Sequence, residues 1–414
     1  MSEPSRTAGG VAAEEPVPFP FSPVIGLDVD PAYAALRERP SLLRVSVPYG
    51  HDAWLATRHE DVRAVLADPR FSRAASADHD EPRLTPLPLR TSVMGLDPPD
   101  HTRLRTVVSH AFTMRRVENL RPWVHALADR LLDEMVEQGP PADLANAFCV
   151  PLAGRVVCAL LGIPFEDREK FQTWLRAHFT TTEMSADEVA AGMRALRGYL
   201  AELVERRRHD PRDDLVTALV RACDEERRCT EEELVGLVSI LLIAGHDTTA
   251  FQMSASAYVL LTHPEQADLL RSRPELASGA VEELLRYVPL IAHVSFARYA
   301  TEDVLVGGTL VREGDAVLPA IPSANRDEAV FPHPDRLDFR RASNPHLGFG
   351  FGPHRCLGAA LVRMQMRVVL PKLLARLPDL RLAVPAAEVP WATGIQARTV
   401  ESLPVTWGAR RAGR

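Results

Sequence analysis

The chain has few cysteines and no long run of basic residues. Its 414 residues carry a net charge of −7, and no basic run is longer than Arg206-Arg207-Arg208, so we expect no nucleic-acid partner. Only five residues are cysteine, an odd number without a Cys-x-x-Cys spacing. This pattern predicts neither a disulfide framework nor a zinc site, and it favours a reducing cytoplasm.

The chain also lacks a long uncharged apolar segment. The longest such run, Leu234 to Gly245, is shorter than the roughly 20 residues of a membrane-spanning helix. Residues 1–23 are rich in Pro, Ala, Gly and Glu and have no apolar core, so we predict a disordered tail without a signal peptide or membrane anchor. No linker divides residues 24–414, which we predict to form a single domain and a monomer without a membrane partner.

What the chain does contain is mostly helical periodicity. It extends from His101 to about His263, and short strands and turns follow Val288 before a final helix at 357–374. The fold class predicted from this order is mainly α (α+β), with small peripheral sheets. Residues 71–96 carry three prolines and no clear period, which is typical of a functional loop.

One helix is predicted to cross the whole domain. Thr230-x-x-Glu233 is a capping box, and the apolar helix that it opens can run to Thr262, about 48 Å at 1.5 Å per residue. Residues 244–249, Ala-Gly-His-Asp-Thr-Thr, interrupt it with poor helix formers that cost up to about 1 kcal/mol each. Something in the fold must offset that cost.

The interruption predicts a small polar groove. The hydroxyl of Thr248 can bond back to the carbonyl of Ala244, and Gly245 leaves room for the helix to open. One face of the helix is predicted to carry Leu241, Ala244 or Gly245, Thr248 and Gln252. A helix kink with an ordinary polar pair is the alternative interpretation of the hexapeptide.

The most informative segment is His346 to Gly358, a glycine-rich loop that ends in Cys356 and a helix start. Its glycines let the backbone pack flat against something large and planar. The helix end points free N–H groups at the sulfur, which predicts a lowered thiol pKa. A haem iron fits this pattern. A single thiolate ligand would donate electron density to the iron and favour O–O cleavage, which is the chemistry of oxygen activation. An inert cysteine after a glycine turn is the alternative.

The motif Phe349-x-x-Gly352-x-His354-x-Cys356-x-Gly358 resembles the haem-binding loop of the cytochromes P-450, the haem-thiolate monooxygenases. The resemblance implies the fold of that family and a haem b. It implies Cys356 as the axial iron ligand, Phe349 and Gly350 beside it, and Gly358 opening the following helix.

The hexapeptide resembles the oxygen-binding Ala-Gly-x-Asp-Thr-Thr signature of the same family. The resemblance implies that Ala244 and Gly245 lie over the haem and leave a notch for O2. Thr248 would donate a hydrogen bond there, and Asp247 would pass protons from solvent, which is general acid work.

The resemblance also assigns charged groups. The haem propionates need cationic partners, and the family positions correspond to His101 with Arg105, Arg298 and His354. Glu283-x-x-Arg286 resembles a buried ion pair of the family, and we assign its completion to Arg336 in Pro334-Asp335-Arg336.

The chain contains no Gly-x-Gly-x-x-Gly loop and no cysteine cluster for an iron–sulfur centre, so its electrons must come from a partner. The resemblance implies NAD(P)H as the source, with a reductase and a small ferredoxin as carriers. Candidates for a basic docking patch are Arg103, Arg115, Arg116, Arg355 and Arg363.

By family position, the substrate pocket is predicted to be lined by Ser92, Val93, Met94, Leu241, Ala244, Ile291, Val294 and Ala397. An apolar lining suits a mid-sized natural product that is hydroxylated or epoxidised. Two alternatives stay open. One is a haem-thiolate enzyme that couples or rearranges substrates or uses peroxide, and the other is a haem-based ligand sensor.

Overall fold

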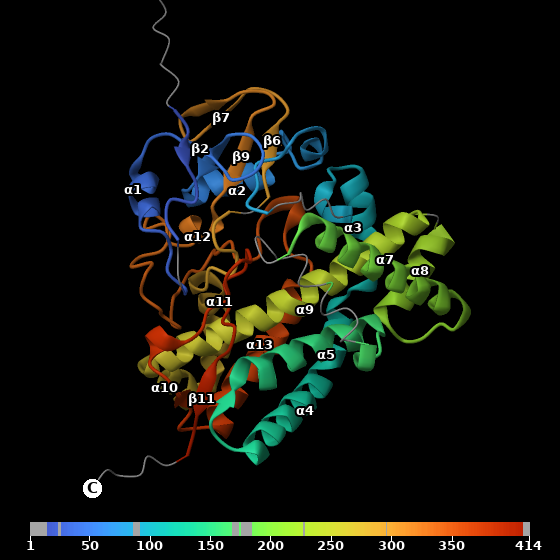
Figure 1. The fold of residues 1–414 in the computed structure, drawn as a ribbon, viewed down its shortest axis with the longest axis vertical. Helices are drawn as coiled ribbons and strands as arrows, with labels where there is room; N and C mark the ends of the chain where they lie inside the picture. Colours follow the sequence, from blue (N-terminus) through green and yellow to red (C-terminus); the bar gives the residue numbers. More distant parts are fainter. Residues whose placement is uncertain are drawn as a thin grey trace, which may run out of the picture.

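The computed structural model describes residues 15–23, 26–85, 92–167, 174, 184–226, 228–294 and 296–408. Helices fill the lower and right-hand parts of Figure 1, and a mixed sheet forms a smaller part at the upper left. The prediction of a helix-rich protein with small peripheral sheets is confirmed. The α-helices are α1 (Ala32–Glu38), α2 (His59–Ala67), α3 (Asp100–Ala111), α4 (Met114–Gln138), α5 (Val150–Leu161), α7 (Ala186–His209), α8 (Leu215–Glu226), α9 (Glu231–Thr262), α10 (Pro264–Ser272), α11 (Ala277–Tyr287), α12 (Ile321–Ala324) and α13 (Ala359–Arg376).

Short helical turns connect these elements. They are η1 (Ala74–Asp78), η2 (Ser92–Gly95), the π-helical η3 (Ala145–Cys149), η4 (Phe165–Asp167), η5 (Pro274–Leu276), η6 (Gly352–His354) and η7 (Ala386–Glu388). Two of them pack against helices described below: η2 contacts α9, and η6 contacts α2.

The largest sheet has six strands in the order β1-β2-β3-β9-β6-β4. Its strands are β1 (Val17–Pro18), β2 (Leu43–Ser46), β3 (Ala53–Ala56), β9 (Ala316–Pro319), β6 (Arg298–Ala300) and β4 (Phe71–Ser72). The pair β3 and β9 is parallel, whereas β6 is antiparallel to both β9 and β4. A three-stranded sheet in the order β10-β11-β5 and a two-stranded hairpin complete the set. These contain β10 (Arg381–Leu382), β11 (Pro404–Thr406), β5 (Ala142–Asp143), β7 (Val304–Val306) and β8 (Thr309–Val311).

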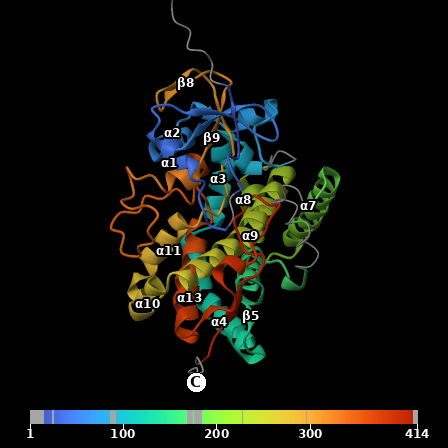
Figure 2. The ribbon, with the colours of Figure 1, turned by 60° about the vertical axis from the view of Figure 1, so that its left-hand side comes forward.

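Helix α9 crosses the middle of the molecule, as both ribbon views show (Figures 1 and 2). Its predicted start is confirmed. The Thr230 hydroxyl accepts from the Glu233 backbone N–H, and the Glu233 carboxylate accepts from the Thr230 N–H. By length and composition α9 is apolar enough to cross a membrane, but most of it is buried in the protein. That burial is typical of a core helix.

The predicted disordered tail is wrong for the part of it that the structure describes. Val17 and Pro18 pair with Val45 and Ser46 in the sheet, and Phe19 is buried. The Phe19 ring packs edge-to-face with the rings of Phe21 and His293, so this segment is held against the protein by aromatic contacts. Residues 1–14 lie outside the described part of the chain.

The cysteine spacing predicted no disulfide framework, yet one disulfide joins Cys223 to Cys229. Helix α8 ends between them and the chain reverses toward the Thr230 cap, which brings the two Cα atoms to 5.2 Å. This distance lies in the ordinary disulfide range. The bond therefore follows from a turn that spacing alone does not predict.

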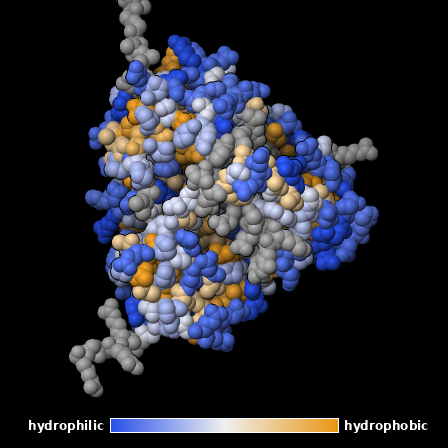
Figure 3. Space-filling view, in the orientation of Figure 1, coloured by the Kyte–Doolittle hydropathy of each residue, from blue (hydrophilic) through white to orange (hydrophobic). Residues whose placement is uncertain are grey.

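On the face drawn in Figure 3, hydrophilic residues cover the right-hand margin around α7 and α8, and hydrophobic residues appear in small groups. Most apolar side chains lie inside, in one large cluster of the helical part and two smaller clusters around the six-stranded sheet. This rigid core positions the site described next.

Candidate functional site

The loop before α13 is tightly packed against α2. Gly350 and Gly352 have φ of +69° and +70°, a conformation that favours glycine. A Cβ on Gly352 would lie 2.3 Å from the carbonyl oxygen of Leu66, so no side chain fits there. The Cys356 N–H donates to the Phe349 carbonyl at 2.8 Å, which closes the turn. The loop therefore places the Cys356 sulfur next to the start of α13.

Cys356 differs from the other four cysteines, all of which the structure describes. Its side chain is exposed, whereas Cys149 and Cys158 are buried and the remaining two form the disulfide. Burial raises the pKa of the Cys149 and Cys158 thiols to about 12, which makes both inert. Cys356 is thus the cysteine best placed to bind a metal.

The prediction of a lowered thiol pKa at Cys356 is wrong. Although the side chain is accessible, the protein atoms around the sulfur desolvate the thiolate and raise the pKa, while the N–H groups of Gly358 and Ala359 and the charge of Arg105 act in the opposite direction. The helix end is therefore not sufficient to hold a thiolate by itself. A bound metal would hold it, since a coordinating thiol is deprotonated outright.

Helix α9 contributes a stripe that other protein atoms leave accessible. Nearly every residue in its middle is buried, but Ala244 is exposed, and Leu241, Gly245 and Thr248 are half-buried. Their spacing of three, four and seven residues places them on one face. The stripe is apolar except for one hydroxyl, which suits contact with a flat apolar ring and a small polar ligand.

The hydroxyl of Thr248 donates to the Ala244 carbonyl at 2.5 Å, as predicted. Gly245 has a second role that the sequence did not indicate. A Cβ there would lie 2.9 Å from Cγ2 of Val157, so the glycine lets α5 approach α9 closely. Asp247, the residue before Thr248, is mostly buried and contacts His246.

Four predicted groups from three elements meet in one cluster. The rings of His101 in α3 and His354 in η6 lie 4.3 Å apart. Arg105 donates to the Arg355 carbonyl, and Arg298 at the start of β6 donates only to backbone carbonyls. Neither arginine forms an ion pair with a described carboxylate. This leaves a buried charge on Arg298 and a half-buried charge on Arg105 without a described anion.

The pKa values of the cluster reflect this environment. Burial, aided by Arg298 and His101, lowers the pKa of His354 to about 3. Burial and the neighbouring Arg73 lower the pKa of Arg298 to about 10. An anionic group placed here would relieve both effects, and arginines bind carboxylates especially well.

Together these features fit a haem. Cys356 would bind the iron, the α9 stripe would face one side of the ring, and the cluster of His101, Arg105, Arg298 and His354 would bind the propionates. Within the described part of the chain, no group of three His, Cys, Asp or Glu residues offers another metal site. When bound, a thiolate-ligated haem supplies oxygen activation.

The sequence analysis missed Asp97, which links this cluster to the loop after β4. Its carboxylate accepts from the Ser72 hydroxyl and from the backbone N–H of Arg73 at 2.9 Å. Its backbone carbonyl accepts from the His101 N–H at 2.9 Å. Arg73 in turn forms a fully buried ion pair with Glu81 at 2.5 Å. Only the position of Asp97, four residues before His101, hints at this role.

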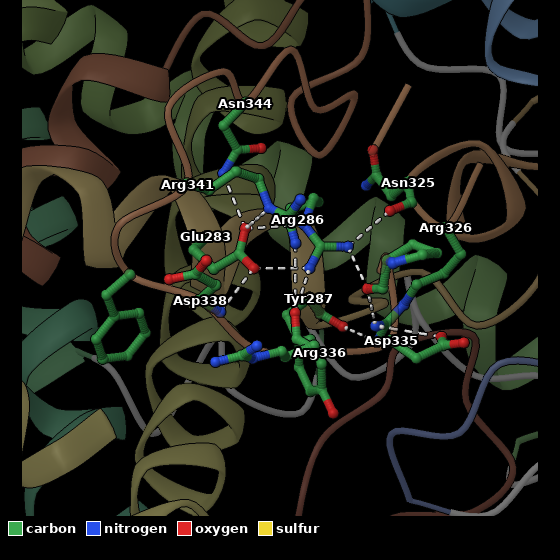
Figure 4. A network of polar contacts seen from close by, with 12 residues as sticks. Glu283, Arg286, Tyr287, Asn325, Arg326, Asp335, Arg336, Asp338, Arg341 and Asn344 are labelled. Atoms are coloured by element: carbon green, nitrogen blue, oxygen red, sulfur yellow. Dashed lines mark hydrogen bonds and ion pairs between the residues drawn. The ribbon is translucent and has the colours of Figure 1, made fainter. Parts of the chain in front are cut away.

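Glu283 and Arg286 form a fully buried pair on α11, as predicted, with a contact of 2.7 Å (Figure 4). The assignment of Arg336 is wrong. Arg341 donates to Glu283 at 3.1 Å, whereas Arg336 is exposed and supplies only its carbonyl, which accepts from Arg286. Because the carbonyls of Pro334 and Arg336 face Arg286, the backbone there turns the Arg336 side chain outward.

A second network, also missed, ties α11 to the cysteine loop. Glu282 accepts from Arg363 at 2.6 Å and from His346 at 3.1 Å. The Arg363 guanidinium lies 4.6 Å from the centre of the Phe349 ring. Burial favours a higher pKa for Glu282, but the hydrogen bonds from His346 and Arg363 hold it at about 2. The network braces the loop that carries Cys356.

Replacing Glu282 with glutamine is expected to destabilise this brace. A pKa shift from 4.5 to about 2 corresponds to about 3 kcal/mol of stability, present above pH 4.5 and lost as the pH falls toward 2. Denaturant unfolding of the haem-loaded protein should therefore show a less stable variant at pH 7, with weaker pH dependence between pH 4.5 and 2. Glu275→Gln, at an exposed residue, is the matched control. An unchanged midpoint for Glu282→Gln would contradict the assignment.

Three candidates for the basic patch already form ion pairs within the protein. Arg363 pairs with Glu282, and Arg103 pairs with Asp100 and Glu233. Arg116 lies 3.6 Å from Asp213. Arg115 and Arg355 are exposed and fit a docking role better.

The predicted pocket residues lie on three segments. Val93 is buried in η2, Met94 packs beside it, and the side chain of Ser92 lies outside the described part. Ile291 bridges to the buried Ala397. Ile291 and Val294 line two adjoining cavities of about 90 and 270 Å³. The sequence did not predict Leu84 and Gln396, which line both cavities.

Comparisons with known proteins agree with this geometry. A family model described as cytochrome P450 matches residues 167–378. The chain is 49% identical to nocardicin C N-oxygenase of Nocardia uniformis subsp. tsuyamanensis over 94% of this chain and 98% of the relative. It is 45% identical to mycinamicin IV hydroxylase/epoxidase of Micromonospora griseorubida over 96% of this chain and 100% of the relative. A crystal structure of HinD with NMFT and NO superposes with a TM-score of 0.93 and 63% identity, covering 95% of this chain and 100% of that one.

The relatives align along almost the whole chain, so the likeness includes both the cysteine loop and the helix above it. Oxygenases, hydroxylases and epoxidases are named among them. The chain therefore belongs to the cytochrome P450 family and is a haem-thiolate monooxygenase that uses O2, a small-molecule substrate and redox partners.

Proposed function

We propose that this monooxygenase hydroxylates or epoxidises a mid-sized, largely apolar natural product in a biosynthetic tailoring step. The observation that carries the proposal is the acid and alcohol pair of helix α9: Thr248 lies on the accessible stripe, and Asp247 is the mostly buried residue before it. Peroxide-driven chemistry has no need of such a pair. The named substrates of two relatives, nocardicin C and mycinamicin IV, support the substrate class.

The reaction needs protons as well as electrons. One O2 takes up two electrons and two protons, one oxygen atom enters the substrate, and the other leaves as water. Thr248 donates its own proton to the Ala244 carbonyl, so its oxygen can accept a hydrogen bond from a water that carries a proton inward. Asp247 is the acid that passes the next proton from solvent to this water.

The cavities beside Ile291 and Val294 favour a neutral substrate. Their lining is mostly apolar. Its polar side chains are the neutral Tyr49, Thr85, His293 and Gln396 and the already paired Glu81 and Arg83. Burial, followed by the charge of Arg398, lowers the pKa of His293 to about 4, so its ring is uncharged at neutral pH. An amide and a neutral imidazole orient hydroxyl or carbonyl groups without requiring a charge.

We further propose that a ferredoxin delivers the electrons and that the enzyme acts as a monomer in the cytoplasm, where NAD(P)H is available. The exposed Arg355 is adjacent to Cys356, and Arg63 of α2 lies 4.4 Å from the Phe351 ring of the same loop. Both are cations on the outer side of this loop. They suit an acidic iron–sulfur protein.

Thr248→Ala is expected to divert electrons from product to peroxide, because water loses its hydrogen-bond partner on the stripe. The share of electrons that reaches product should fall on the order of tenfold or more, as positioned proton transfer contributes at least that much. Peroxide and product are measured together during reductase-driven turnover.

Thr262→Ala is the matched control. Thr262 makes the same type of bond in the same helix, from its hydroxyl to the Tyr258 carbonyl at 3.0 Å, but it lies far from the stripe. We expect it to couple electrons as the unmodified enzyme does. Equal coupling in Thr248→Ala would remove the proposed role of the hydroxyl.

The substrate class is tested by optical difference spectra of the haem protein against a panel of polyketides, terpenoids and peptides. A Soret shift with one class, followed by oxygenated product under reductase-driven turnover, supports the proposal. A shift that yields only coupled or rearranged products contradicts oxygen insertion. No shift with any compound contradicts the proposed substrate class.

A further inference from the structure

The residue before the proposed acid makes an unusual contact with it. Nδ1 of His246 lies 2.5 Å from Oδ1 of Asp247, although consecutive side chains on a helix point about 100° apart. The His246 side chain is 6% exposed and that of Asp247 is 15% exposed. Each of the two side chains must therefore adopt a particular rotamer for the contact to form.

A glycine on the neighbouring helix makes room for the imidazole ring. Helices α5 and α9 pack along each other near the middle of the molecule (Figure 1). A Cβ on the buried Gly154 would lie 2.9 Å from Nε2 and 3.4 Å from Cδ2 of His246, and 3.7 Å from the ring of Phe165. Ala is a better helix former than Gly, and no turn occurs at this point of α5. The close approach of the ring is what requires glycine.

We propose that His246 is a positioning residue, which, seated over Gly154, holds the Asp247 carboxylate in the orientation needed for proton delivery toward Thr248. This inference rests on the proposed function of the Asp247 and Thr248 pair. A ring N–H that donates to a carboxylate forms a strong, directional hydrogen bond. Without it, the partly exposed carboxylate would sample several rotamers, and few of them would serve the stripe.

Two substitutions of His246 have opposite expected results for positioning and for packing. The space over Gly154 that the His246 ring occupies is called the slot. Asn places an N–H close to the position of Nδ1 but leaves part of the slot empty, whereas Phe fills the slot without a donor. If His246 positions Asp247, the share of electrons lost as peroxide should rise several-fold in His246→Phe and stay near the original value in His246→Asn. A purely structural role predicts the reverse order, and that result would overturn the proposal.

Turnover is measured with the compound that gives the largest Soret shift, driven either by a ferredoxin and its reductase or by added hydrogen peroxide. Peroxide supplies both oxygen atoms in reduced form, so that reaction does not depend on proton delivery during O2 reduction. We expect His246→Phe to keep its peroxide-driven rate. Equal losses in both reactions would contradict a role in proton delivery.

The slot is tested from the other helix. Gly154→Ala should displace the ring and cause the same loss to peroxide, although no residue of the acid and alcohol pair is changed. Gly198→Ala is the matched control, because a Cβ on Gly198 in α7 meets nothing within 4 Å. Normal coupling in Gly154→Ala would contradict the slot.

A spectroscopic readout separates this inference from the proposed function. In the ferrous carbonyl state, ¹⁵N-histidine labelling should reveal a hydrogen-bonded imidazole N–H that is lost in His246→Asn and shifted in Asp247→Asn. If the signal behaves so but no substrate is oxygenated, the proposed function fails and the contact stands. If the signal is the same in Asp247→Asn, the positioning role fails whatever the substrate.

Discussion

Replacing Cys356 with serine is expected to abolish the thiolate signature of the ferrous carbonyl spectrum and most monooxygenase activity. A serine hydroxyl is not deprotonated at neutral pH and donates much less electron density to iron, so O–O cleavage loses its driving force. The loop should still fold, because its turn depends on Gly350 and Gly352 and on the Cys356 backbone N–H. The spectrum and the haem content of the purified variant are the measurements.

The chain provides controls for this experiment. Cys149→Ala and Cys158→Ala remove buried thiols with raised pKa, and both variants should keep the signature. They lose some packing, so the comparison is made on haem-loaded protein. A thiolate signature that persists in Cys356→Ser would mean that another sulfur binds the iron.

Glu283→Gln is expected to cause the largest loss of stability. The Glu283 carboxylate accepts from Arg286, Arg341, Asn344 and the Asp338 N–H, all in the network of Figure 4. Its neutralisation leaves buried guanidinium charge without an anion, which costs about 3–5 kcal/mol. Domains are stable by only about 5–15 kcal/mol, so the variant should express poorly and lose haem. Denaturant unfolding and the haem content per chain measure both effects.

The pair of Asp303 and Arg312 is a suitable comparison, because both side chains are largely exposed at 47% and 66%. Asp303→Asn should change stability by no more than about 1 kcal/mol. Arg336→Ala should also be mild, since only the carbonyl of Arg336 reaches the network. Destabilisation by Arg336→Ala as large as that by Glu283→Gln would restore the first assignment.

Some features were predictable because short-range patterns determine them. The start of α9 depends on Thr230 and Glu233, three residues apart, and the bond from Thr248 to Ala244 spans one turn. The cysteine loop is likewise a local turn, in which the positive φ of Gly350 and Gly352 favours glycine. Such features need only the neighbouring residues, and the family resemblance added their roles.

Choices among similar side chains were not predictable. Arg336 and Arg341 lie five residues apart, and the packing of the 334–341 segment against α11 decides which one reaches Glu283. The pKa of Cys356 was also misjudged, since its shift depends on burial in the folded protein, which the local motif does not predict. Long-range packing sets both outcomes.

By itself the sequence determined the helix-rich class, the long central helix and the cysteine loop, because period, capping and glycine turns act over a few residues. The tertiary structure decided which charges are paired and which are not. Among the described residues, no carboxylate pairs with Arg298, whereas Arg363 pairs with Glu282 and Gly154 of α5 lies against the ring of His246. These contacts join segments far apart in the chain, and only the packed core fixes the distances on which hydrogen bonds and ion pairs depend.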